Sequence, residues 1–383
     1  MKQTLKTIIR NVKSINGNSL AEFATTTALM ATLAATAAPK LSEMSEGAKA
    51  EKSMNEIDKI LTQARNHYQT TADTEGRGRF PGQEKFDVAV VGGGVMGCST
   101  VLHLSRNQMR TIIIDSGALC REASGTNAGT LTLNMTRAAL IPYAIKGWEL
   151  WNNTEKWLCG GVGTRKVNGL SLAFTEEEEE LLFKRIEARQ AMGAPIKFIS
   201  GRKAQLLEPG LNNSVRSAAW CNKDGFTIAY LTGHAFRRAL KQENVSVREY
   251  SKVNKIEIEK NYFKIIFENN EHLKAKRIVL AGGVWLEEML NWLNVKIKIK
   301  CLINQLIITE RMPPVMKTVL SIANGLLSLK QFDNGTVLIG GGWQGIGDKK
   351  LGGVESIPEN LIGNIRLACH VIPKLRYGRM IRV

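Results

Sequence analysis

Three glycines and one aspartate have the types and the spacing that bind a dinucleotide. Gly92, Gly94 and Gly97 form the pattern G-x-G-x-x-G, and Asp115 follows Gly92 by 23 residues. In this pattern the first glycine permits a tight turn, the second lets backbone amides approach a pyrophosphate, and the third lets a helix pack closely on a sheet. An acid about 20 residues further on can accept hydrogen bonds from a ribose. An aspartate at that place, rather than a basic residue, argues against NADP.

The segments around these residues must position them. Residues 86–91 are a short apolar run that predicts a strand, residues 95–107 predict a helix, and residues 111–114 predict a second buried strand. Val95 and Met96 would then lie at the helix N-terminus, where unpaired N–H groups and the helix dipole favour phosphate. A βαβ unit of this kind predicts an α/β fold, and by itself it leaves FAD and NAD open.

The rest of the chain turns from α/β to a strand-rich pattern. Thr175 and Glu178 form a capping box that opens a helix running to about Met192. Residues 247–279 alternate as a strand meander, with Asn269 and Asn270 at a turn. Further elements are expected as a helix at residues 230–242 and as strands at residues 295–300 (half-buried, with a lysine face), 302–310, 325–331 and 336–340.

Composition places only broad bounds on function. The chain of 383 residues has 52 Lys plus Arg against 35 Asp plus Glu, a net charge of +17. The basic residues are interleaved with apolar ones and no nucleic-acid recognition motif accompanies them, so we expect a solvated basic surface and no nucleic-acid partner. The six cysteines include no Cys-x-x-Cys pair and no metal-ligand spacing, which predicts reduced thiols and no metal site.

Residues 1–85 differ in character from everything after them. Residues 1–38 combine a basic leader with an Ala/Thr-rich apolar run, which can be interpreted as a secretory signal or as a plain Ala-rich helix. Gly17 followed by Glu22 resembles the processing site of type IV pilin precursors, which would make residues 18–38 a membrane contact. Residues 39–85 predict an amphipathic helix and a linker, so the expected architecture includes an N-terminal helical extension.

Several later motifs extend the resemblance to a known family. From residue 86 onward the sequence is similar to the FAD-dependent oxidoreductases of the D-amino-acid oxidase type, which include sarcosine and glycine oxidases and D-amino-acid dehydrogenases. The similarity is carried by ASGTNAG at residues 123–129, LEPGL at 207–211, Asp224-Gly225, AGGVW at 281–285 and GTVLIGG at 335–341.

This resemblance implies a Rossmann-like FAD-binding domain with an inserted α+β substrate domain built on a mostly antiparallel sheet. We expect the FAD-binding domain at residues 86–158 and 226–300, and the substrate domain at residues 159–225 and 301–383. The family continues past Val383 with a glycine-containing segment, so the resemblance implies a substrate domain that is C-terminally short.

The resemblance also implies the cofactor and its contacts. FAD is expected to be noncovalent, because the loop that carries a flavin-linking histidine in some relatives here has Thr126, Asn127 and Ala128. The implied FAD-binding residues are Gly92, Gly94, Val95, Met96, Gly97, Asp115, Ser124, Gly125, Thr126, Asn127, Ala128, Gly129, Val253 and Gly282.

The implied reaction is oxidation of the C–N bond of an amine or amino acid by hydride transfer to flavin N5, giving an imine that water hydrolyses. Such a site needs a cation for the substrate carboxylate, and Arg137 and Arg311 are the candidates. Three other side chains, Gln305, Trp343 and Gln344, are candidate pocket residues. A histidine at position 234 is more consistent with packing or a surface position than with catalysis.

Two other interpretations compete with the flavoenzyme. One is a pilin-like, membrane-anchored protein whose flavin domain is vestigial, and the other is an NAD-binding module without flavin. Flavoproteins fold where FAD is made and no twin-Arg signal is present, so we expect a cytoplasmic protein with residues 18–38 as a candidate inner-membrane tether. The substrate, the electron acceptor and the oligomeric state cannot be derived from the residues.

Overall fold

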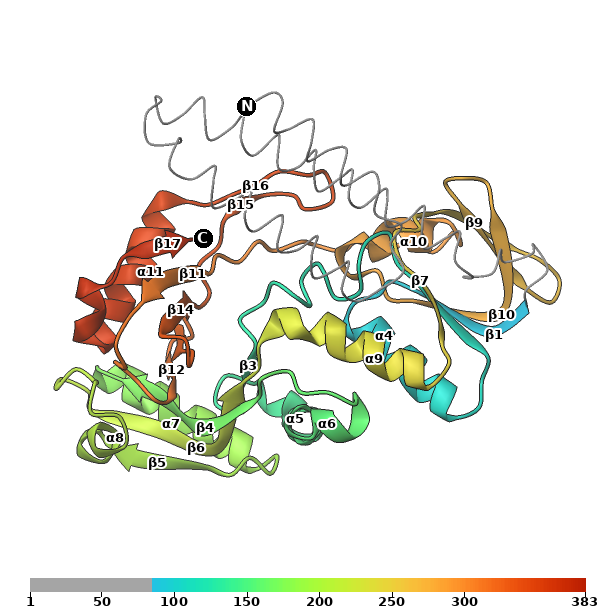
Figure 1. Ribbon diagram of the computed structural model, residues 1–383. Helices are drawn as coiled ribbons and strands as arrows, with labels where there is room; N and C mark the ends of the chain where they lie inside the picture. Colours follow the sequence, from blue (N-terminus) through green and yellow to red (C-terminus); the bar gives the residue numbers. More distant parts are fainter. Residues whose placement is uncertain (1–84) are drawn as a thin grey trace, which may run out of the picture. The chain divides into compact units, whose positions relative to one another are not determined.

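The computed structural model describes residues 85–383, so the interpretations placed on residues 1–84 lie outside the described part. One six-stranded sheet has the order β7-β2-β1-β10-β9-β8. Its first four strands run parallel, and β10, β9 and β8 form an antiparallel meander (Figure 1). In this order the strands are β7 (Ser246–Arg248), β2 (Thr111–Ile114), β1 (Lys85–Val91), β10 (His272–Leu280), β9 (Phe263–Phe267) and β8 (Val253–Ile258).

Two helices cover one face of this sheet. Helices α4 (Val95–Arg106) and α9 (Thr232–Gln242) lie side by side (Figure 1) and share a core with β1 and β2. Within α4 the buried residues Gly97, Cys98, Val101 and Leu102 recur at helical spacing, so one face of the helix packs on the sheet. The opposite face of the sheet packs against Met289 of α10 (Leu286–Asn291).

A second, nine-stranded sheet has the order β17-β11-β14-β13-β12-β4-β6-β3, with β5 paired to β6. Every pair is antiparallel except β12 with β4, as the resemblance implied. The strands are β3 (Thr130–Leu131), β4 (Arg165–Ala173), β5 (Ile196–Ser200), β6 (Ser217–Phe226), β11 (Ile307–Arg311), β12 (Val319–Ile322), β13 (Ser328–Gln331), β14 (Thr336–Gly340) and β17 (Met380–Arg382).

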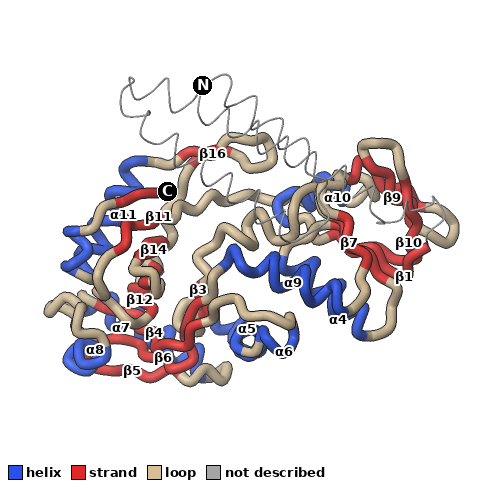
Figure 2. Tube along the Cα trace, viewed as in Figure 1, coloured by secondary structure: helices blue, strands red, loops and turns tan. Residues whose placement is uncertain are grey.

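Helices pack on both faces of the second sheet. One face forms an apolar core with α8 (Gly201–Leu207) and α11 (Pro358–Val371). The other face is covered over β4, β5 and β6 by α7 (Glu176–Gln190), as Figure 2 shows. The remaining elements are η2 (Ala138–Leu140), α5 (Ile141–Asn152), α6 (Thr154–Trp157), η3 (Ala229–Leu231), η4 (Gly283–Trp285), η5 (Pro373–Tyr377) and the small hairpin of β15 (Ile346–Gly347) and β16 (Val354–Glu355).

Most of the expected elements are present, but the expected strand at residues 325–331 begins only at Ser328, and β7 pairs in parallel with β2 instead of joining the meander expected over residues 247–279. The helix at residues 176–190 begins at the predicted cap, where Thr175 Oγ1 accepts from the amide of Glu178 at 3.2 Å. Residues 295–300 form no strand; they are a mostly exposed loop, with Ile297 exposed by 53%. The strand expected at residues 302–310 begins only at Ile307, and before it Asn304 forms only an isolated bridge to Gln344. The segment at residues 295–300, where lysine alternates with apolar residues, therefore has no neighbouring strand in the described part of the chain to pair with.

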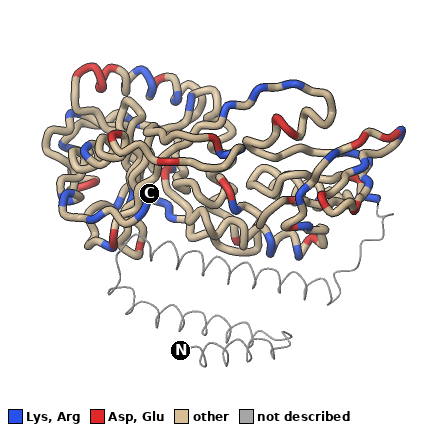
Figure 3. The backbone as a smooth tube through the Cα atoms, turned by 90° about the horizontal axis from the view of Figure 1, so that it is seen from above, with Lys and Arg blue, Asp and Glu red and all other residues tan. Residues whose placement is uncertain are grey.

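The surface charge of the described residues is dispersed. Basic and acidic positions are interspersed along the chain (Figure 3). All six cysteines are free thiols, and Cys98, Cys120 and Cys221 are buried. Between residues 85 and 383 no helix is long and apolar enough to cross a membrane, and no group of three or more His, Cys, Asp or Glu side chains in that range could hold a metal ion.

A buried glutamate secures the loop that leads into β12. Glu208, from the LEPGL motif, is only 2% exposed. One of its oxygens, Oε2, accepts from the amides of Lys317 and Thr318 at 2.8 and 2.9 Å and from Thr318 Oγ1 at 2.8 Å. Three donors on one carboxylate oxygen compensate for its burial.

Replacing this glutamate should destabilise the fold in a graded way. Glu208→Ala leaves three donors without a partner and should lower the free energy of unfolding by about 3 kcal/mol. Glu208→Gln retains one acceptor oxygen and should lower it by roughly half as much. Urea denaturation of both variants, with the exposed Glu187→Gln on α7 as control, measures the difference. Equal stability of Glu208→Ala and the control would contradict this role.

Candidate functional site

The glycine loop joins β1 to α4 through two backbone contacts that leave no room for a Cβ. Gly92 has a φ of +109°, and a Cβ there would lie 2.4 Å from the carbonyl oxygen of Ala281. A Cβ added at Gly97 would lie 1.9 Å from the carbonyl oxygen of Gly92. Both glycines are therefore required by the close approach of strand, turn and helix, as the pattern predicts.

The N-terminus of α4 is open to an anion. Its N-cap, Gly94, makes no side-chain cap hydrogen bond, and the first turn contains no acidic residue. Ser124 Oγ accepts from the amide of Val95 at 3.0 Å, which brings the loop at residues 123–129 to the same helix end. The first amide of the helix is thus already bonded to Ser124, and the positive end of the helix dipole favours phosphate at this position.

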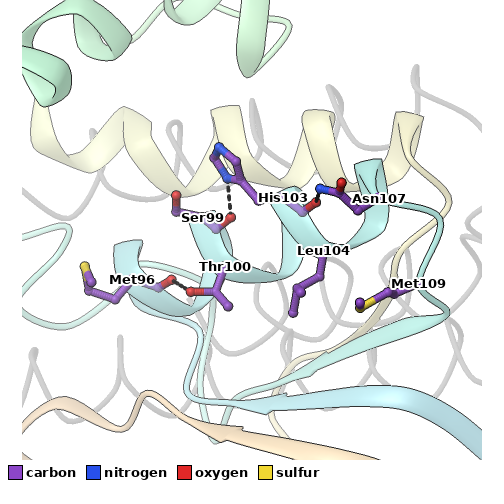
Figure 4. A pocket seen from close by; sticks show the side chains of 7 residues that line it. All are labelled: Met96, Ser99, Thr100, His103, Leu104, Asn107 and Met109. Carbon is purple, nitrogen blue, oxygen red and sulfur yellow. Dashed lines mark hydrogen bonds between the residues drawn. The ribbon is translucent and has the colours of Figure 1, made fainter.

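The side chain of Met96 points to the outer face of α4. The side chain is 72% exposed and lines a hollow of about 500 Å³ on the outer face of α4, together with His103 and Leu104 (Figure 4). This hollow lies along the helix; apart from Met96, its lining residues belong neither to residues 92–97 nor to the loop at residues 123–129. We therefore assign the site to the cradle around the glycine loop and not to the hollow.

Asp115 stands at the carboxyl end of β2, beside the glycine loop. Its Oδ2 accepts from the amide of Gly93 at 2.5 Å and its Oδ1 accepts from the amide of Gly117 at 2.7 Å. Burial raises the pKa of the carboxyl, and these two hydrogen bonds act in the opposite direction. Because each carboxylate oxygen can accept more than one hydrogen bond, both retain the capacity to accept from a ribose hydroxyl.

A second acid near this edge was not found from the sequence. Glu249 follows β7, the strand next to β2, and its Oε1 accepts from the amide of Leu119 at 2.6 Å. Arg237 of α9 donates to Glu249 through Nε at 3.0 Å and Nη2 at 2.5 Å, and this hydrogen bonding raises the pKa of the guanidinium. An acid directly after a parallel strand is the sequence signal for this residue, but β7 is only three residues long and its partner Leu119 is 130 residues away along the chain.

The loop at residues 123–129 is held by its own hydrogen bonds. Asn127 Nδ2 donates to the carbonyl of Ala123 at 2.9 Å, and Asn127 Oδ1 accepts from the amide of Gly129 at 2.7 Å. Gly129 has a φ of +65°, and a Cβ there would lie 2.2 Å from the carbonyl oxygen of Thr227. Gly125 is equally confined, with Cys120 O at 2.2 Å from the position of a Cβ.

The other residues expected at the cofactor lie at the following places. Thr126 and Ala128 belong to the same loop, with Thr126 exposed. Gly282 follows β10, the parallel neighbour of β1, at the same sheet edge as Gly92. Val253 begins β8 and its side chain is 7% exposed within the core of the first sheet, so only its backbone is available to a ligand.

The candidate carboxylate-binding arginines lie on elements other than the glycine loop. Arg137 is the exposed N-cap residue of η2, and Arg311 is the exposed last residue of β11. Of the other candidates, Gln305 is 5% exposed and its Oε1 accepts from the amide of Ile357 at 2.7 Å. Trp343 Nε1 donates to the carbonyl of Leu326 at 2.7 Å. His234 and Gln344 are exposed.

A parallel strand order with its glycine turn at the carboxyl edge defines a dinucleotide-binding protein, because ligands of such sheets bind outside that edge. The chain belongs to the FAD-dependent oxidoreductase (DAO) family, whose model matches residues 87–382. The residues fit FAD, since side chains at positions 92 and 97 would collide with main chain, a side chain at position 94 would crowd Ser124 Oγ, and Asp115 accepts from the amide of Gly93 beside them.

Curated relatives include three kinds of oxidase. The chain is 27% identical to an opine oxidase subunit of Rhizobium meliloti (66% of this chain, 70% of the relative) and 22% identical to glycine oxidase of Geobacillus kaustophilus (78% and 79%). It is 28% identical to glycerol 3-phosphate oxidase of Mycoplasma pneumoniae, over 52% of this chain and 54% of the relative. What these proteins act on differs, so the substrate is not fixed by similarity.

Solved structures with low sequence identity share the fold. The glycine oxidase of Geobacillus kaustophilus aligns with a TM-score of 0.69 and 20% identity, covering 78% of this chain and 81% of the other. L-proline dehydrogenase from P. horikoshii aligns with a TM-score of 0.70 and 22% identity, covering 78% and 80%. An FAD-bound glycerophosphate oxidase from Mycoplasma pneumoniae aligns with a TM-score of 0.67 and 19% identity, covering 78% and 82%.

The contact between Gly97 and the Gly92 carbonyl yields a test with a matched control. Gly97→Ala places a methyl group against main chain and should lower the free energy of unfolding by about 3 kcal/mol or more, with loss of flavin. Gly147→Ala in α5 meets no atom within 4 Å and should raise it by about 0.5–1 kcal/mol. Flavin content per chain and thermal midpoints measure both. Retention of flavin by Gly97→Ala at the level of Gly147→Ala would exclude the assigned cradle.

Proposed function

We propose that this chain oxidises the C–N bond of an amine or amino acid with noncovalent FAD. The observation that carries the proposal is the backbone cradle of Gly92, Gly94 and Gly97 beside Asp115 in a chain of the FAD-dependent oxidoreductase family. When bound, FAD would accept a hydride from the substrate at N5, and water would hydrolyse the imine product. The names of the glycine and opine oxidase relatives support an amine or amino-acid substrate.

The chain's own residues would bind and orient the reactants. The open N-terminus of α4 would receive the pyrophosphate, and Asp115 would accept from the ribose. The loop at residues 123–129 passes directly into β3, the edge strand of the second sheet, so this sheet would form the wall on which the substrate lies. We propose the substrate domain at residues 159–225 and 301–383, and Arg137 or Arg311 as the cation for a substrate carboxylate.

Release of the cofactor and reduction by substrate test the proposal together. Acid precipitation of the purified, FAD-loaded chain should leave the flavin in the supernatant, because the loop at residues 126–128 offers no histidine for a covalent link. Anaerobic addition of glycine, sarcosine, proline, D-amino acids or opine-like secondary amines should bleach the flavin for at least one of them. Glycerol 3-phosphate is the comparison compound, since oxidases named for it are also relatives. Bleaching by glycerol 3-phosphate alone would overturn the C–N assignment.

The roles of Arg137 and Arg311 can be tested by comparing KM for a substrate that has a carboxylate with KM for one that lacks it. Loss of a charge-assisted hydrogen-bonding partner for a carboxylate should raise KM for an amino acid by about 10–100-fold. The same variant should leave KM unchanged for a reactive amine that lacks the carboxylate. Arg137→Gln and Arg311→Gln are compared, with the exposed Arg202→Gln on α8 as control. If neither variant changes KM for the amino acid, both candidates are excluded.

A further inference from the structure

Lys330 is a lysine with no exposed surface in the second sheet. It lies in β13, where the preceding residue, Leu329, packs into the core shared with α11. Because side chains alternate along a strand, Lys330 points to the opposite face. Its exposed fraction is 0%, the same as that of Leu329. A lysine is rarely buried to this extent unless an acid accompanies it.

No acid accompanies this lysine within the described residues. Its one hydrogen bond is donated by Nζ to Thr130 Oγ1 at 2.5 Å, and the rings of Phe226 and Phe332 lie 5.9 and 6.0 Å from Nζ. An isolated buried ammonium is unfavourable, and burial lowers the pKa of Lys330 to about 7.

The charged groups on the surrounding elements have partners of their own. Asp224 of β6 accepts from Leu133 N, Thr132 Oγ1 and Asn134 Nδ2. In the turn between β13 and β14, Asp333 forms an ion pair with Arg165 of β4, and Lys166 of β4 lies over the ring of Trp148. The strands β3, β12 and β14 contain no titratable side chain. A methionine of similar length would therefore fill this place at lower free energy.

The partner of Lys330 is the residue that links the two parts of the candidate site. Thr130 directly follows Gly129, which ends the loop held by Asn127. Thr130 Oγ1 also lies 3.5 Å from Ser328 Oγ, two residues before Lys330 on the same strand. The backbone of Thr130 pairs with Phe226 in the sheet. The hydrogen bond from Lys330 to the Thr130 side chain is therefore a second, separate contact that holds β3.

We propose that Lys330 is a positioning residue for the cofactor loop. Its hydrogen bond to Thr130 holds the start of β3, and with it the end of the loop at residues 127–129, against the second sheet. A buried group that opposes stability while holding a binding loop is the kind of local conflict that functional sites retain. The inference rests on the proposed function only in assigning that loop to FAD.

The variant Lys330→Met distinguishes a positioning role from a packing role, because a positioning residue should change stability and FAD affinity in opposite directions. Removing the buried amine, which has no acid to compensate its charge, should raise the thermal midpoint of the FAD-free chain at pH 7. Loss of the hydrogen bond to Thr130 should weaken FAD binding about tenfold, as expected for one buried hydrogen bond. Hydrogen exchange at the amides of residues 127–131 should become faster in the FAD-free variant, a readout that needs no bound flavin.

Thr130→Val and Lys197→Met serve as matched variants. Thr130→Val removes the acceptor at nearly constant shape and should weaken FAD binding as much as Lys330→Met, while lowering the thermal midpoint because the amine loses its last partner. The double variant should bind FAD no more weakly than either single variant, since both remove the same contact. Lys197 of β5 is exposed, and Lys197→Met should change neither quantity.

The stability difference should depend on pH in a defined direction. Between about pH 7 and the ordinary lysine value of 10.5, the unfolded chain binds more protons at Lys330 than the folded chain. Stability of the parent chain should therefore rise with pH across this window, and the advantage of Lys330→Met should shrink toward pH 10. Lys197→Met should show no such convergence.

Each failure has a separate signature. A Lys330→Met variant with a lowered midpoint, unchanged hydrogen exchange and unchanged FAD affinity would show that Lys330 only packs, and would leave the proposed function intact. Absence of FAD binding by the parent chain would overturn the proposed function. The hydrogen-exchange and pH results would then still decide whether Lys330 fixes the loop.

Discussion

The approach of α4 to the end of β1 is the constraint on which the candidate site depends. Gly97 comes so near to the Gly92 carbonyl that no side chain fits between them. This contact sets the position of the helix N-terminus relative to the carboxyl edge of the sheet, where Asp115 and Gly282 also lie. Backbone amides, a helix dipole and the carboxylate of Asp115, which two backbone amides hold in place, then lie at one edge of the sheet.

The second sheet is joined to this cradle through one short strand. Two contacts fix the ends of the loop at residues 123–129. Ser124 accepts a hydrogen bond from the first amide of α4, and Gly129 packs against the carbonyl oxygen of Thr227. The loop then continues as β3, which pairs with the end of β6. Asp224 of β6 accepts from three donors at residues 132–134, immediately after β3. The geometry of a substrate wall relative to the cofactor cradle is therefore determined by a few contacts around residues 124–134.

The sequence predicted the elements of the first sheet well because local signals determine them. Residues 111–114 are a run of apolar β-branched residues and became a strand with those bounds, and the glycine pattern marked the turn before α4. The prediction of a strand at residues 295–300 was wrong, because an alternating pattern indicates an amphipathic segment but not whether a neighbouring strand is present to pair with it. Glu249 and Lys330 were missed for a related reason: their importance comes from Leu119 and Thr130, which are 130 and 200 residues away along the chain.

Three buried ionisable groups, two in the second sheet and one at the end of α8 beside it, differ in how many hydrogen-bond partners the fold gives them. Glu208 receives three donors and Asp224 also receives three, although burial still raises the pKa of Asp224. Among residues 85–383, Lys330 has a single acceptor. The first two groups organise loops and are compensated within the fold, which is what a structural carboxylate requires. The third is undercompensated at the junction between the cofactor loop and the sheet. The position of Lys330 beside the loop at residues 123–129, more than its charge, supports a role for this lysine in the candidate cofactor site.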